Sequence, residues 1–195
     1  MIIWLNGAFG SGKTTSAFEL KRRLPNSFVY DPENIGYFIR ENIPKELHES
    51  NFQDHEQWRI FNYEMLKYIS NTYEGTVIVP MTIFHPQYYE EIVQKLIDEG
   101  IPLRHFILYA DKNTLLKRLN KRLERGETWA KSQIDRCIEV FNTEITEEKI
   151  ITDNKSIDFV VEEIAKRSGM SLLLDKRTYL KKLIDRVAVL IKHIR

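Results

Sequence analysis

The sequence of 195 residues has little of what several classes of protein require. Its single cysteine, Cys137, cannot form an internal disulfide, which fits a reducing compartment. Eight Gly and six Pro are too few for a fibrous or low-complexity chain. No apolar run approaches the roughly 18 residues that span a bilayer, and the first residues lack the basic start and apolar core of a signal peptide. We therefore expect a cytoplasmic protein of about one folded domain.

Net charge is also nearly absent, because 29 Lys and Arg oppose 28 Asp and Glu. A net charge of +1 argues against a nucleic-acid partner. The charges are nevertheless unevenly distributed. Residues 176–195 hold seven basic residues and one acid, a local net charge of +6, which leaves −5 for the rest of the chain. The pattern predicts a mildly acidic body with a basic C-terminal tail.

Short β-rich runs alternate with longer amphipathic segments, a pattern typical of a parallel sheet crossed by helices. We expect strands near residues 2–5, 27–30, 76–79, 104–109 and 149–151. We expect helices near residues 13–24, 55–73, 87–99, 112–124, 129–141 and 156–168, and another over residues 178–195.

A glycine-rich loop between the first strand and the first helix satisfies G-x-x-x-x-G-K-[ST]. Its residues are Gly7, Ala8, Phe9, Gly10, Ser11, Gly12, Lys13 and Thr14, followed by Thr15. The glycines allow backbone N–H groups to turn inward around phosphate oxygens. Lys13 would contact the β- and γ-phosphates, and the Thr14 hydroxyl would bind Mg²⁺. ATP is favoured over GTP, because the chain has no N-K-x-D and no D-x-x-G after the second or third strand.

The loop and the order of elements predict an α/β chain with the three-layer fold of P-loop NTPases, of nucleoside-monophosphate-kinase and shikimate-kinase type, around a parallel five-stranded sheet. We expect a kinase-like domain over residues 1–169. Within it, a substrate-binding insertion would span about 34–73 and a lid about 122–131. Residues 170–195 would form a connector and a basic amphipathic helix.

Asp31 follows the second strand, at the sheet edge where ligands of parallel α/β proteins bind. Its carboxylate would take the proton of a substrate hydroxyl or hold a magnesium-bound water. Alternatively, it is a turn residue before Pro32. The third strand runs into Pro80-Met81-Thr82, where many P-loop enzymes carry a metal-ordering aspartate. Asp31 would then be the metal partner and Thr82 a hydroxyl contact.

The insertion concentrates side chains suited to sugar or base rings and to anionic groups. The candidate substrate contacts are Asp31, Tyr37, Arg40, Trp58, Arg59, Asn62 and Thr82. Under the alternative interpretation, a helical pair in this region buries its own aromatic side chains, as we expect for Phe38 and Phe61. For Arg40, Trp58 and Arg59 both interpretations stay open.

Arginines recur after the fourth strand, where kinases place a lid over the transferred phosphate. Arg118, Arg122 and Arg125 share one helix face at spacings of four and three, and Arg136 follows. We expect Arg118, Arg122 and Arg136 to neutralise charge on the phosphoryl group as the lid excludes water. The alternative is a solvated basic face. Asn154 would border adenine, or it belongs to a loop and helix cap with no such role.

The tail has a single apolar stripe at positions 180, 183, 184, 187, 190, 191 and 194. Lys181, Lys182, Arg186 and Lys192 lie on the opposite face, and Val189 does not fit the pattern. A basic amphipathic helix over residues 178–195 is typical of a segment that lies in a membrane interface. A C-terminal helix packed on the body has a similar stripe, so both interpretations stay open.

Further segments carry more specific patterns. They are residues 1–14, Tyr30-Asp31-Pro32, Trp58-Arg59 with Phe61-Asn62-Tyr63, residues 78–82 with His85-Pro86, residues 115–119, residues 133–137 and Thr152-Asp153-Asn154. Together they resemble the bacterial tunicamycin-resistance ATP-binding proteins over essentially the whole chain. The resemblance implies a nucleoside-kinase-like fold, ATP binding, resistance to the nucleoside antibiotic tunicamycin, and membrane association through the tail.

Two functions remain open. The first is an ATP-dependent phosphotransferase, monomeric or homodimeric, that acts on a hydroxyl of tunicamycin or a related nucleotide-sugar-like molecule. The second is an ATP-dependent protein that sequesters the drug at the inner face of the membrane without modifying it. The lid arginines favour the first function, and the missing third-strand aspartate favours the second.

Overall fold

Five parallel strands form the central sheet of the structure, a computed structural model that describes residues 1–121, 126 and 128–193. The strands are β1 (Ile2–Asn6), β2 (Ser27–Val29), β3 (Thr76–Pro80), β4 (Leu103–Tyr109) and β5 (Glu148–Ile151). Their order across the sheet is β2-β3-β1-β4-β5, and every neighbouring pair is parallel. The predicted α/β class and the five-stranded parallel sheet are confirmed.

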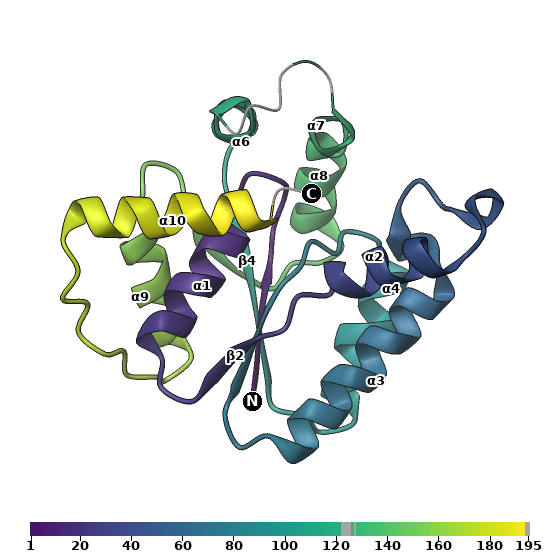
Figure 1. Cartoon of the computed structure of the whole chain (residues 1–195), viewed down its shortest axis with the longest axis horizontal. Coiled ribbons are helices and arrows are strands. Elements are labelled where there is room, and N and C mark those ends of the chain that lie inside the picture. The colour runs from purple at the N-terminus through teal and green to yellow at the C-terminus, as the bar shows by residue number, and fades with distance from the viewer. Residues whose placement is uncertain (122–125, 127, 194–195) are drawn as a thin grey trace.

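Helices cover both faces of the sheet, which gives the three expected layers (Figure 1). One face carries α1 (Lys13–Arg23) and α9 (Ile157–Arg167). The other face carries α2 (Glu33–Asn42), α3 (Glu56–Thr72), a continuous helical stretch of α4 (Pro86–Tyr89), η3 (Glu90–Gln94) and α5 (Lys95–Asp98), and α8 (Ile134–Thr143). Short 3-10 turns η1 (Lys45–Leu47) and η2 (Phe52–Asp54) lie between α2 and α3. Helices α6 (Lys112–Lys121) and α7 (Trp129–Ser132) lie past the carboxyl ends of the strands.

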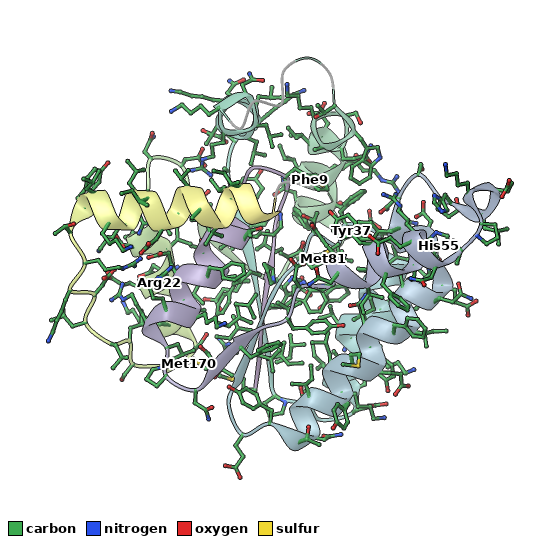
Figure 2. The ribbon with its side chains drawn as sticks, in the orientation of Figure 1. Phe9, Arg22, Tyr37, His55, Met81 and Met170 are labelled. Carbon is green, nitrogen blue, oxygen red and sulfur yellow. The ribbon has the colours of Figure 1, made fainter. Side chains whose placement is uncertain are left out.

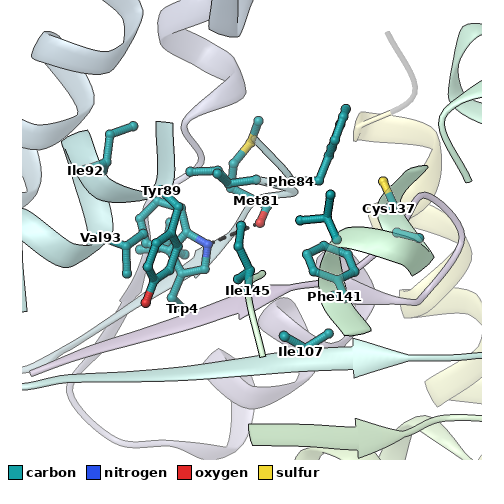
Figure 3. Packing of buried hydrophobic residues seen from close by; sticks show 14 of the residues in the cluster. Trp4, Met81, Phe84, Tyr89, Ile92, Val93, Ile107, Cys137, Phe141 and Ile145 are labelled. Atoms are coloured by element: carbon teal, nitrogen blue, oxygen red, sulfur yellow. Dashed lines mark hydrogen bonds between the residues drawn. The ribbon is translucent and has the colours of Figure 1, made fainter. Parts of the chain in front are cut away.

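Successive side chains of β1 point to opposite faces of the sheet, and the core is accordingly divided into two clusters. Ile2 and Trp4 pack with the α3 side, and Ile3 and Leu5 pack with the α1 side, as successive strand residues must. All four are fully buried. The Trp4 indole donates a 3.2 Å hydrogen bond to the carbonyl oxygen of Met81, so its one polar atom is satisfied within the packed core (Figure 3).

Helix α2 is an element that the sequence pattern did not predict as a separate helix. Its interior contains Gly36, a residue that disfavours helices because it adds backbone freedom to the unfolded chain. The structure explains why glycine is needed there. A Cβ at Gly36 would lie 2.5 Å from Cγ of Phe52, so the ring can pack on α2 only over a bare backbone.

Helix α10 (Tyr179–His193) crosses the outer side of α1 and attaches to it through its charged face (Figure 1). Arg177, just before the helix, donates to both carboxylate oxygens of Glu19 at 3.2 and 2.6 Å and pairs with Asp185 at 2.8 Å. Arg186 pairs with Asp158 at 2.8 Å. The helix therefore packs on the body, as in the alternative interpretation, but it does so through its charged face, and most of the apolar stripe stays exposed.

The apolar stripe of α10 therefore divides into two edges. Leu183, Val187 and Leu190 form the pocket edge, because they line a cavity described below. Leu180, Ile184 and Ile191 form the outer edge, with 64%, 54% and 68% of their surface exposed. Val189, the residue that did not fit the stripe, is half-buried. No helix among the described residues is both long and apolar enough to cross a membrane.

The ion pairs of α10 should make its attachment depend on pH. Hydrogen bonds from Arg177 hold the pKa of Asp175, and that of Asp185, below the ordinary carboxyl value. A pKa lowered by folding means that these groups stabilise the attached helix above about pH 4. That stabilisation disappears as the pH falls further and the carboxylates bind protons.

We predict that Asp175→Asn lowers the free energy of opening of α10 at pH 7 by about 1–3 kcal/mol, because Arg177 loses a charged acceptor. The difference from the unmodified protein should shrink between about pH 4 and 2. Hydrogen exchange of α10 amides, corrected for intrinsic rates, measures this free energy. Asp98→Asn, an exposed carboxylate on α5, is the control. A pH-independent difference would contradict ionic attachment.

Candidate active site

Three glycines determine the path of the phosphate loop. Gly7, Gly10 and Gly12 have φ angles of 135°, 85° and 101°, which residues with a side chain rarely adopt. A Cβ on Gly7 would also lie 2.4 Å from the carbonyl oxygen of Leu108. Helix α1 begins at Lys13, directly after the loop, so its N–H groups and partial positive charge face the same place. The geometry is that of an anion-binding nest.

The side chains of the loop match a polyphosphate. Lys13 Nζ donates to the carbonyl oxygens of Gly7 and Ala8 at 2.8 and 3.1 Å, which holds the ammonium group over the loop. The buried hydroxyl of Ser11 has no hydrogen-bond partner among the described residues. Thr14 is half-buried in the first turn of α1. An ammonium group, a hydroxyl without a partner and inward N–H groups suit phosphate oxygens, and the Thr14 hydroxyl suits Mg²⁺.

Asn6, the last residue of β1, connects the start of the phosphate loop to the segment that follows β3. Its Oδ1 accepts hydrogen bonds from the backbone N–H groups of Gly7 at 2.8 Å and Ile83 at 2.9 Å. Its Nδ2 donates to the carbonyl oxygen of Ile83 at 2.8 Å. The side chain is fully buried, so these three bonds satisfy polar groups that water cannot reach.

Thr82 continues this connection toward the insertion. Its hydroxyl donates to the carbonyl oxygen of Gly7 at 2.9 Å, and its own carbonyl accepts from Gln53 Nε2 at 2.9 Å. The residue is buried. Thr82, predicted as a hydroxyl contact, is thus buried next to the phosphate loop, and its hydroxyl supports Gly7, the first residue of that loop.

Asp31 lies at the carboxyl end of β2 and is half-buried. Its Oδ1 accepts the N–H of Glu33 at 3.1 Å, which is the turn geometry that starts α2. Both chain neighbours of Asp31 are held from α3. Asn62 accepts the hydroxyl of Tyr30 at 2.8 Å, and the Trp58 indole donates to the Pro32 carbonyl at 3.0 Å.

Trp58 and Asn62 are fully buried and have no exposed surface, so their role in the structure is to support the two chain neighbours of Asp31. Arg59 is also buried. It donates to two backbone carbonyls of η2 and forms an ion pair with Glu91. Arg40 donates to two carbonyls of the loop before η2, at 3.1 and 2.9 Å, and Tyr37 is half-buried near Phe52. In Figure 2, Tyr37 and Met81 are labelled near the end of the sheet that carries the phosphate loop.

Arg118 joins the phosphate loop to the segment after β5. Its guanidinium donates to Thr152 O at 2.6 Å and Thr152 Oγ1 at 3.0 Å, with a longer contact to Gly10 O at 3.5 Å. A cavity of about 390 Å³ lies beside these residues. Asn154 is an exposed turn residue with φ of 53°, and Ser156 is the residue that caps α9. Arg122 and half of the expected lid, residues 122–125 and 127, lie outside the described residues.

A second, polar cavity of about 180 Å³ has walls from η2, the start of α4, α7 and α8. Arg136 lines it together with side chains that the sequence analysis did not select. These are Gln53, Asp54, His85, Tyr88 and Gln133. Trp129 also lines the cavity, and its ring meets Phe9 of the phosphate loop edge-on at 5.3 Å. His85 and Gln133 fall within the family-specific segments, which is the signal that could have identified them.

Comparison with family models matches residues 2–143 to a family described as an AAA domain. Comparison with curated proteins found no match. Among solved structures, the tunicamycin resistance protein of Deinococcus radiodurans is 33% identical, with a TM-score of 0.77. The match covers 89% of this chain and 98% of that one.

Two further structures are similar in fold. A sugar kinase from Janibacter sp. HTCC2649 is 16% identical with a TM-score of 0.59, covering 87% of this chain and 95% of that one. Shikimate kinase from Bacteroides thetaiotaomicron is 18% identical with a TM-score of 0.56, covering 87% and 99%. The expected likeness to P-loop kinases of this type is confirmed.

We predict that Asn6→Ala lowers the free energy of unfolding by at least about 3 kcal/mol, because three backbone groups lose their buried partner. It should also weaken binding of inorganic triphosphate, since Gly7 loses its anchor. Urea unfolding and calorimetry measure the two effects. Asn113→Ala, an exposed position on α6, is the control. Equal stability of the two variants would contradict the role of Asn6.

Proposed function

The chain belongs to the family of bacterial tunicamycin-resistance proteins with a P-loop AAA domain, and on that premise we propose that it is an ATP-dependent phosphotransferase. The substrate would be tunicamycin or a related nucleoside- or nucleotide-sugar-like molecule with a free hydroxyl group. The P-loop kinase-like fold supports nucleotide binding, and the finer assignment rests on the arrangement of the two cavities.

The observation that carries the proposal is a pair of cavities, one lined by the phosphate loop itself and one lined by Trp129, whose ring contacts Phe9 of that loop. Gly10 and Arg118 line the larger one, and Arg136 and Asp54 line the smaller one. The Phe9–Trp129 contact joins the smaller cavity to the loop. A phosphotransferase needs a donor site and an acceptor site that meet at the transferred phosphate, whereas a sequestering protein has no need of this arrangement.

On the donor side, Lys13 would exchange its bonds to Gly7 and Ala8 for bonds to the β- and γ-phosphate oxygens. The hydroxyl of Thr14 would hold Mg²⁺, with Asp31 as the second metal contact of the sequence-based prediction. Bound Mg²⁺ would supply positive charge against the phosphate oxygens. Arg118, fixed by Thr152, would add a cation at the edge of the loop.

On the acceptor side, a substrate hydroxyl oxygen would attack the γ-phosphorus while the bond to the β-phosphate oxygen breaks and ADP leaves. The hydroxyl proton would pass to the Asp31 carboxylate, which has one oxygen engaged by the N–H of Glu33. Arg136 would stabilise the charge of the transferred group, and Arg122 keeps this predicted role from outside the described residues. Trp58 and Asn62 would act as positioning residues through the neighbours of Asp31.

We predict that incubation with Mg·ATP and tunicamycin adds one HPO₃, about 80 Da, to the drug. Mass spectrometry of the drug measures this. Asp31→Asn should retain ATP affinity and lose at least about 100-fold in rate, because the proton acceptor is removed. Asp98→Asn should react as the unmodified protein does.

Drug that binds in the presence of ATP but gains no mass would overturn transfer and support the sequestering alternative. An unchanged rate in Asp31→Asn would remove Asp31 from the mechanism and leave transfer itself intact.

We further propose that the protein makes peripheral contact with the inner face of the membrane through the outer edge of α10. Leu180, Ile184 and Ile191 are exposed on one side of this helix, away from the ion pairs that attach it. Exposed apolar side chains at helical spacing can enter the interfacial region of a bilayer.

We predict that replacing all three outer-edge residues with Ala removes sedimentation with vesicles that contain phosphatidylglycerol. The same replacement of Leu183, Val187 and Leu190 should leave most of it. Equal sedimentation of both variants would contradict the assignment of the outer edge. Pure phosphatidylcholine vesicles separate the apolar contribution from the electrostatic one, which salt screens.

A further inference from the structure

The larger cavity beside the phosphate loop has walls from four parts of the chain. The loop itself and the first turn of α1 contribute Gly10, Ser11, Gly12 and Thr15. Helix α6 contributes Arg118 and Lys121, and the segment after β5 contributes Thr152, Lys155, Ile157 and Val160. The fourth wall is α10, with Leu183, Arg186, Val187 and Leu190. Its volume of about 390 Å³ lies in the range of small-molecule sites.

The lining combines two kinds of group. Backbone N–H groups of the phosphate loop and the guanidinium of Arg118 suit the charged part of a nucleotide. Ile157 and the pocket edge of α10 are apolar and suit an uncharged ring. A nucleotide whose phosphates lie in the loop would therefore direct its base toward α10.

We propose that α10 is a wall of the nucleotide-base site, so that binding of a purine base and attachment of the tail stabilise one another. The inference rests on the proposed binding of ATP and adds the residues that recognise the base. The pocket edge would cover one side of the ring, while Arg118, held by Thr152, would stay at the phosphate loop.

Because α10 is attached through its opposite face, the apolar side chains of its pocket edge can stay exposed to the cavity. The helix is held by the ion pairs of its opposite face, including Arg186 with Asp158 and Arg177 with Glu19. On its pocket edge, Leu183 and Val187 remain 47% and 45% exposed. A bound base would remove part of this surface from water, which is the source of the expected affinity.

The test compares ATP with inorganic triphosphate, which has the phosphates but no base. We expect the triple variant Leu183→Ala, Val187→Ala and Leu190→Ala to bind ATP about tenfold more weakly, and to bind inorganic triphosphate unchanged, by calorimetry. The control is Leu180→Ala, Ile184→Ala and Ile191→Ala on the outer edge of the same helix. It should bind both probes as the unmodified protein does.

The outcomes separate this inference from the function on which it rests. If the unmodified protein binds neither probe, the proposed ATP binding fails. If it binds ATP and the pocket-edge variant binds ATP equally well, only the base-site inference is overturned. The same holds if both triple variants lose ATP affinity to the same extent, or if triphosphate affinity falls with that for ATP.

Reciprocity supplies a second measurement on the unmodified protein. If the docked tail raises the affinity for ATP tenfold, then ATP must favour the docked tail by the same factor. Tryptic cleavage at exposed Lys176 and Lys181 reports the undocked state. Saturating ATP should slow this cleavage by up to about tenfold in the unmodified protein, and inorganic triphosphate should not. Equal protection by both probes would overturn the role of the base.

Discussion

The active site depends on one buried side chain, Asn6. The phosphate loop starts where β1 ends, and the same amide group binds the first N–H of that loop and both backbone groups of Ile83. The loop can bind phosphate only if its N–H groups point at one position, and this requires that its first residue be held in place. Thr82 then bonds to Gly7, and Gln53 bonds to Thr82, so the chain of hydrogen bonds extends into the insertion. The phosphate loop and the insertion thereby share one buried support.

Local signals were sufficient for the parts of the fold that the sequence predicted well. The loop from Gly7 to Thr14 is a contiguous motif, and β1 and β3 are short runs buried on both faces, so each can be recognised without its neighbours. Helix α2 was missed because Gly36 weakens its helical pattern. The reason for that glycine lies in Phe52, which packs on it from another part of the chain and carries no local signal.

The candidate site was harder to predict, because residue type does not distinguish a ligand contact from an internal support. Trp58, Arg59 and Asn62 have the side chains that a sugar or phosphate site would use. In the structure, their polar atoms serve backbone carbonyls, Glu91 and Tyr30. The sequence could not assign their partners, since those partners are 4 to 32 positions away. His85 and Gln133, by contrast, line the smaller, polar cavity without any general motif.

The basic tail and the acidic body, whose charges nearly cancel, meet where α10 is attached. There, Arg177 and the basic side chains of α10 lie against Glu19, Asp158 and Asp175. Helix and body are joined by charges, whereas the sheet is held by buried apolar side chains. Ionic strength screens the first kind of contact, and salting-out ions strengthen the second. The tail and the body should therefore respond in opposite directions to sulfate. Solvent composition could thus separate the two without a denaturant or a mutation.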